Sequence, residues 1–138
     1  MLVLDSNHLS ELERKSANGA ALRLRLAQST EPMATTIVCI EEQMRGWLSQ
    51  IARCPNPLAQ VADYDRLQIL LKSYSRLTVL PFDAAAAAKF GELRQQHKRT
   101  GTMDLKIASI VLVNNAKLLT RNLKDFRSIT GLVAEDWL

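Results

Sequence analysis

Short strand-like segments alternate with helical segments over the whole sequence, and this alternation limits the fold more than any other feature. The segments between the expected strands carry apolar residues at helical spacing, and this order is typical of a parallel sheet covered by helices on both faces. We therefore expect an α/β fold in three layers, α/β/α, with a central parallel sheet of four to five strands in a single domain, residues 1–138. The expected strands are residues 1–4, 33–36, 77–80, 118–120 and 131 onward.

Polar caps, glycines and prolines place the helices between these strands. Ser6 or Asn7 is expected to cap the first helix, and Asn18-Gly19 to break the chain before a helix at 20–27. Further helices are expected at 37–52, at 57–74, at 84–96 after the cap Asp83, and from Asp104 to Val113. The helix at 57–74 should form a hairpin with the preceding helix, and its predicted apolar face consists of Leu58, Val61, Leu67, Leu70, Leu71 and Tyr74.

Composition excludes several classes of protein. The chain has only two cysteines, Cys39 and Cys54, and neither belongs to a C-x-x-C pair, so a zinc or redox site is not expected and a reducing compartment is. Cys39 lies in an apolar run and is expected to be a small buried residue. The N-terminus lacks the basic region of a signal peptide. The longest apolar run, 107–113, is far shorter than the roughly 20 residues of a membrane helix. We expect a soluble cytoplasmic protein that does not associate with a membrane.

The segment from Gly101 to Gly131 indicates where a functional site lies. It places Asp104 at the start of a helix and Asn122 just after a strand. In a parallel sheet, helix N-termini and strand C-termini share the edge where ligands bind. Asp5, at the end of the first strand, and Glu42, near a helix start, can reach the same edge. Glu41 and Glu42 are both expected in the first turn of their helix, where the helix dipole would favour them.

Several carboxylates at one edge require a cation. Two carboxylates about 4 Å apart repel by roughly 4 kcal/mol at an effective dielectric constant near 20, and the pKa of one of them rises. Ligands that are all oxygen select hard ions, so Mg²⁺ or Mn²⁺ is the expected cofactor. The chain carries a net charge of +4, and without Asp5, Glu42 and Asp104 the remainder would carry +7. A basic exterior around an acidic pocket suits a polyanionic substrate.

Four short segments occur in order along the chain: 4–10 (LDSNHLS), 40–46 (IEEQMRG), 104–108 (DLKIA) and 119–126 (LTRNLKDF). In sequence and spacing they resemble the motifs of the PIN-domain family and, within it, of the VapC toxins of bacterial toxin–antitoxin pairs. The resemblance implies that Asp5, Glu42 and Asp104 bind the metal. In the family's motif the glutamate precedes the glycine by four residues, and this spacing to Gly46 selects Glu42 rather than Glu41. Asn122 stands where the family often has aspartate, which removes one negative charge, and Asp125 is not expected to bind the ion directly.

The resemblance also implies an activity and partners. The activity is Mg²⁺- or Mn²⁺-dependent hydrolysis of RNA phosphodiesters, with Asp5, Glu42, Asp104 and Asn122 in the catalytic site. The implied partners are RNA, a small antitoxin that presents an arginine or lysine to the carboxylates, and a second copy of the chain in a homodimer. Candidate contacts to the substrate are Ser6, which keeps the hydroxyl of the family's usual threonine, and Arg45, Lys98, Arg99, Lys106 and Arg121.

Three other functions were weighed. A receiver domain would have adjacent acids after the first strand, but Ser6 follows Asp5. A phosphatase with an aspartyl nucleophile would have D-x-D there, but Asn7 occupies the second place. The remaining alternative is a PIN-fold protein with weak or no turnover that binds nucleic acid or a partner protein, and Asn122 is the feature that favours it.

Overall fold

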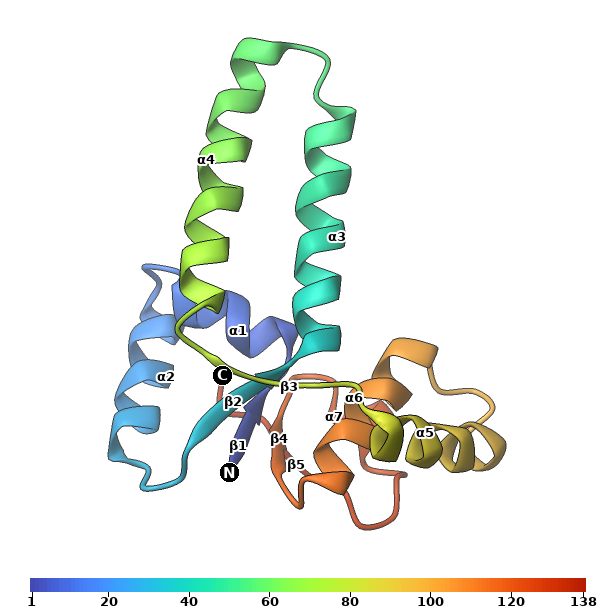
Figure 1. Ribbon diagram of the computed structural model, residues 1–138. Coiled ribbons are helices and arrows are strands. Elements are labelled where there is room, and N and C mark those ends of the chain that lie inside the picture. The colour runs from blue at the N-terminus through green and yellow to red at the C-terminus, as the bar shows by residue number, and fades with distance from the viewer.

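A five-stranded, all-parallel sheet lies at the centre of the computed structural model, which describes residues 1–138 (Figure 1). The strand order is β3-β2-β1-β4-β5, so the predicted parallel sheet and its strand number are confirmed. Because helices lie on both faces, the fold has the three layers predicted. The strands are β1 (Leu2–Leu4), β2 (Met33–Thr36), β3 (Thr78–Leu80), β4 (Lys117–Leu119) and β5 (Val133–Glu135).

The order of the strands puts a topological switch point beside β1. From β1 the chain adds β2 and then β3 on one side, and it then returns to place β4 and β5 on the other side. Ligands bind in parallel sheets at such a switch, outside the C-terminal ends of the strands. Asp5 follows β1 and Thr120 follows β4, so these two residues lie at the switch point.

Seven helices connect the strands. Helices α3 and α4 form an antiparallel hairpin that extends away from the sheet, whereas α5 and α6 pack as a pair on the sheet (Figure 1). None of these helices combines the length and the hydropathy needed to cross a bilayer. The helices are α1 (Ser6–Glu13), α2 (Ala17–Gln28), α3 (Ile37–Arg53), α4 (Pro57–Tyr74), α5 (Ala84–Gln96), α6 (Thr102–Val113) and α7 (Leu123–Phe126).

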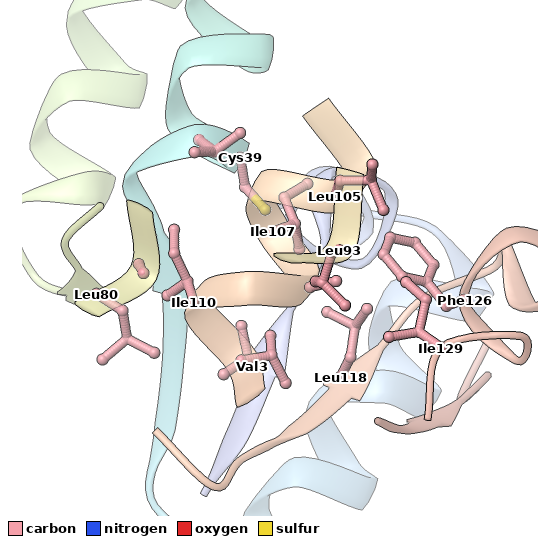
Figure 2. Close-up of a cluster of buried hydrophobic side chains, with 14 of the residues drawn as sticks. Val3, Cys39, Leu80, Leu93, Leu105, Ile107, Ile110, Leu118, Phe126 and Ile129 are labelled. Carbon is pink, nitrogen blue, oxygen red and sulfur yellow. The ribbon is translucent and has the colours of Figure 1, made fainter. Parts of the chain in front are cut away.

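Helix α6 is the centre of the hydrophobic core. Its residues Leu105, Ile107 and Ile110 are almost fully buried and pack with Val3 of β1 and Phe126 of α7 (Figure 2). A helix that is apolar on nearly all sides must be enclosed by other elements. Because α6 is fixed in this way, its first turn, and with it Asp104, has a defined position at the edge of the sheet.

Two sequence predictions were wrong, one about the cap of the first helix and one about the residues in the first turn of the third helix. The first helix is capped by Asp5, not by Ser6 or Asn7, because the Asp5 backbone is extended and its carboxylate accepts a hydrogen bond from Ser6 N. The third helix begins at Ile37 as predicted, but Glu41 and Glu42 then lie beyond its first turn. Their interaction with the dipole of α3 is correspondingly small, because it falls off within one turn.

The predicted break at Asn18-Gly19 was also wrong, since both residues lie inside α2. The Ser16 side chain caps this helix by accepting a hydrogen bond from Gly19 N at 2.9 Å. A Cβ atom at position 19 would lie 2.4 Å from the Glu11 carbonyl oxygen and 2.6 Å from the Arg14 carbonyl oxygen. Glycine is therefore required by the close approach of α1 and α2, not by a turn.

The apolar face predicted for α4 is mostly exposed. Of its six residues only Leu70 and Tyr74 are buried, whereas Leu58 is 80% exposed and Val61 and Leu71 are each 53% exposed. The hairpin with α3 forms as predicted. It projects beyond the sheet, so only its base is covered by the rest of the chain (Figure 1).

We predict that Gly19→Ala destabilises the fold by about 1–3 kcal/mol, the usual cost of forcing atoms into a packed region. The matched control is Gly91→Ala in α5, where an added Cβ meets no atom within 4 Å. This control should stabilise the protein by roughly 0.5–1 kcal/mol, because alanine is the better helix former. Urea unfolding of both variants measures the difference, and equal stabilities would contradict the close approach of α1 and α2.

Candidate active site

Asp5 is the most firmly held carboxylate at the C-terminal edge of the sheet. Its side chain accepts hydrogen bonds from Ser6 N at 2.7 Å and from Thr120 Oγ1 at 2.6 Å. Its backbone N–H donates to the Leu119 carbonyl at 3.0 Å. Asp5 is only 6% exposed. The end of β1 is therefore fixed to the end of β4 by both main chain and side chain.

Thr120 was not recognised as a site residue from the sequence. Besides donating to Asp5, its Oγ1 accepts a hydrogen bond from Asn122 N at 3.0 Å. One buried hydroxyl thus sets the position of both Asp5 and Asn122 relative to β4. The available signal was a hydroxyl residue two positions before Asn122 at the end of a strand, within the motif at 119–126.

Glu42 reaches the site from α3. Ser6 Oγ donates a hydrogen bond to Glu42 Oε2, and next to it Gln43 Nε2 donates to the Ser6 carbonyl at 2.8 Å and to Ser10 Oγ at 2.7 Å. These contacts join α3 to α1 beside Asp5. Burial raises the pKa of Glu42, the Ser6 hydrogen bond lowers it, and the negative charge of Asp5 raises it again.

Asp104 reaches the site from the first turn of α6. Asn122 Nδ2 lies 3.3 Å from Asp104 Oδ2 and 2.8 Å from Asp125 Oδ2, and it donates to both. Burial, followed by the charges of Asp5, Glu42 and Asp125, raises the pKa of Asp104 to about 6. The predicted site acids therefore share one edge of the sheet and act on one another electrostatically.

These carboxylates have no protein cation beside them. None of the ion pairs of the structure involves Asp5, Glu42, Asp104 or Asp125. Instead, hydroxyl and amide groups bond to them, and no three His, Cys, Asp or Glu side chains lie close enough together to enclose one ion. The acids nevertheless act on one another, since the charges of Asp5 and Glu42 raise the pKa of Asp104. An uncompensated, all-oxygen set of this kind fits a hard divalent cation such as Mg²⁺ or Mn²⁺.

Cys39 lies against Asp5 but is not suited to metal binding. It is fully buried, as predicted, and its Sγ is 3.8 Å from Asp5 Oδ1. Burial, together with the charge of Asp5, raises the pKa of the Cys39 thiol to about 12. The thiol therefore stays protonated at neutral pH, and only a thiolate would act as a ligand or nucleophile.

None of the basic residues predicted to contact substrate forms an ion pair with the site carboxylates. Arg45 pairs with Glu41 on the exposed side of α3 at 2.6 Å. Lys106 Nζ lies over the Phe82 ring at 5.6 Å. Arg121 follows β4, and its charge acts on His8 and Glu11 of α1. Arg99 lines a cavity of about 400 Å³ together with Gln95, Gln96, His97, Lys98, Thr100 and Ser128.

We predict that Asp104→Asn stabilises the protein at pH 7 in EDTA. The raised pKa of Asp104 means that its ionisation costs stability as pH rises from 3.8, the ordinary value, through about 6. Asparagine removes this cost, which for a half-buried group is about 1–2 kcal/mol or roughly 3–6 °C in Tm. At pH 4 the difference should nearly vanish, because the wild-type carboxyl is then largely protonated. Thermal unfolding at both pH values measures the effect, and a variant less stable at pH 7 than the wild type would contradict it.

Comparison with known proteins adds partial sequence matches to two nucleases. The chain is 39% identical over 67 residues to ribonuclease VapC2 of Rickettsia felis, a match covering 46% of this chain and 50% of that protein. It is 36% identical over 67 residues to the tRNA(fMet)-specific endonuclease VapC of Shigella flexneri, covering 46% and 51%. The matched segment thus spans about half the length of these curated relatives.

Solved structures resemble the chain over nearly its full length. VapBC2 from Rickettsia felis, bound to a DNA fragment from its promoter, superimposes with a TM-score of 0.74 at 26% identity, covering 99% of this chain and 98% of the other. DNA-bound VapBC from Salmonella typhimurium gives 0.77 at 25% identity, with the same coverage. The family model of the PIN domain matches residues 2–132. With the fold, the order of its motifs and this match in agreement, the chain belongs to the PIN domain family.

Proposed function

We propose that this protein is a Mg²⁺- or Mn²⁺-dependent endoribonuclease that acts as the toxin of a toxin–antitoxin pair. The observation that carries this proposal is the group of acids at the switch point, Asp5, Glu42 and Asp104, which no basic side chain neutralises. These acids occupy the motif positions of a family to which ribonucleases belong. The partial match to proteins named ribonuclease VapC2 and tRNA(fMet)-specific endonuclease supports the same reaction.

In this proposal some side chains hold the ion and others position those that hold it. Asp5, Glu42 and Asp104 would hold the ion, which when bound lowers the pKa of a water and offsets negative charge on the phosphate. Thr120 holds Asp5 in place, and Ser6 orients Glu42. Asn122 donates to Asp104 of α6 and to Asp125 of α7, so it fixes the two helices relative to each other beside the site.

An antitoxin partner is proposed because the structural neighbours are VapBC complexes. A groove of about 320 Å³ between α1 and α4 offers a surface for it. The groove is mainly apolar, and α4 carries further exposed apolar residues beyond it, including Leu58, which is 80% exposed. An amphipathic segment of the antitoxin would cover these residues. The proposal also includes a homodimer, which would place two sites in one assembly. The groove is lined by Leu9, Leu12, Glu13, Arg66, Ile69, Leu70, Ser73, Arg76 and Leu77.

A PIN-fold protein that binds without turnover is the second candidate. Asn122 favours it, because an amide in place of a carboxylate leaves the site with one less negative charge. The two candidates differ in one measurable property, the cleavage of RNA in the presence of a divalent ion.

We predict that the purified protein cleaves a pool of structured RNA, tRNA included, with Mg²⁺ or Mn²⁺ but not in EDTA. Asp104→Asn should reduce the rate at least 100-fold, because loss of a metal ligand removes several kcal/mol of charge stabilisation. The matched control is Asp65→Asn, the same chemical change at an exposed position of α4, which should cleave like the wild type. Gel analysis of labelled RNA measures all three proteins.

The outcomes separate the candidates. Cleavage that survives both EDTA and Asp104→Asn would come from a contaminant and would reject the site. Absence of cleavage with RNA still bound would favour the second candidate.

A further inference from the structure

A further cavity opens beside Glu42, and none of the roles described above uses it. It has a volume of about 280 Å³, close to the lower end of the range for small-molecule pockets, about 300 Å³. Ser6 and Glu42 form its boundary with the site, and the rest of its lining lies along α3. The α3 residues are Gln43, Gly46, Trp47 and Gln50.

The two glutamines in the cavity have their amide nitrogens already engaged. Gln43 Nε2 donates to the Ser6 carbonyl and to Ser10 Oγ. Gln50 Nε2 donates to Asp63 Oδ1 at 2.8 Å, across the hairpin. An amide nitrogen fixed in this way leaves the carbonyl oxygen of the same side chain as the group available to a ligand. The cavity therefore presents two neutral hydrogen-bond acceptors.

Trp47 supplies an aromatic wall, and Gly46 supplies room. The Trp47 ring is held between α3 and α4, because the Arg66 guanidinium lies over it at 5.5 Å and its edge packs on the small cluster of Leu9, Leu70 and Tyr74. At Gly46 an added Cβ would meet nothing within 4 Å. Packing within the chain thus does not require glycine there, and its effect is to leave the cavity open.

A basic cavity lies at the start of α6. It has a volume of about 500 Å³ and is lined by Arg94, His97 and Lys98 together with the hydroxyls of Thr100 and Thr102. Thr102 and Leu105 of this lining belong to the start of α6, the helix whose first turn carries Asp104. A ligand that binds in both cavities needs an anionic part for the basic one and a flat polar part for the one along α3. A single RNA strand has this character, since its phosphates are anionic and its bases stack on aromatic side chains.

We propose that the cavity along α3 binds one nucleobase of the RNA strand next to the phosphate that is cleaved. This inference rests on the proposed ribonuclease function and adds a base subsite to it. The base stacks on Trp47, and its N–H groups donate to the carbonyl oxygens of Gln43 and Gln50. Cytosine carries an amino group with two hydrogens, whereas uracil has only one ring N–H, so cytosine binds better than uracil in this subsite.

Binding of short oligonucleotides in EDTA tests the subsite without cleavage. The probes are labelled trimers of cytidine and of uridine, which match in ring size, and the readout is fluorescence anisotropy. Gly46→Leu fills the cavity with a side chain that meets no clash at its Cβ. It should weaken binding of the cytidine trimer about tenfold, within the range measured for the loss of one stacked base. Its matched control, Ala52→Leu, places the same side chain at an exposed position on another side of α3 and should bind like the wild type.

Trp47 variants check the aromatic contribution. Trp47→Leu should weaken cytidine binding and Trp47→Phe should restore most of it, with thermal unfolding used to verify that both variants fold. Equal binding of the two trimers by the wild type, or unchanged binding by Gly46→Leu, would overturn the subsite.

Two results separate this inference from the ribonuclease function. If Mg²⁺-dependent cleavage occurs but Gly46→Leu changes neither binding nor the bases found at the cut, the function stands and the subsite is rejected. If Gly46→Leu weakens binding of the antitoxin but not of RNA, the cavity belongs to the protein partner and the proposal is overturned.

Discussion

The buried carboxylate of Asp5 is the interaction on which the rest of the site depends. It caps α1, accepts the Thr120 hydroxyl from β4 and lies against Cys39 of α3, so three elements that are distant in sequence meet at one side chain. All of its partners are neutral donors, and none is a cation. The protein therefore holds the Asp5 carboxylate in place without pairing it with a cation. An unpaired carboxylate of this kind gives a favourable free energy of binding to a divalent ion.

The sequence predicted the features that depend on chain order. Strands alternating with helices gave the parallel sheet, and the residues that follow strands or begin helices gave the edge where Asp5, Asp104 and Asn122 lie. It did not predict contacts that exist only after packing. By sequence alone Thr120 is an ordinary strand residue, and its role comes from the pairing of β4 with β1. Gly19 is by sequence a turn residue, and its role comes from the close approach of α1 and α2. The role of Gln43 between α1 and α3 was missed for the same reason.

Helix α4 shows a different limit of sequence patterns. Its apolar residues predicted a buried face, yet the hairpin projects beyond the sheet and leaves most of them exposed. An apolar stripe on a helix indicates that something covers it, but it does not distinguish the same chain from a partner. In this hairpin the stripe is covered by the same chain only at the base. The base packs on the domain, and the remainder is exposed.

Titration of the metal-free protein with Mn²⁺, followed by electron paramagnetic resonance, tests the central claim that the carboxylates form a divalent cation site. The account predicts that the signal of free Mn²⁺ is lost up to at least one ion per chain for the wild type, and that Asp5→Asn abolishes most of this binding. Asparagine can still cap α1, so circular dichroism should show a folded variant. Binding by Asp5→Asn equal to that of the wild type would contradict the account.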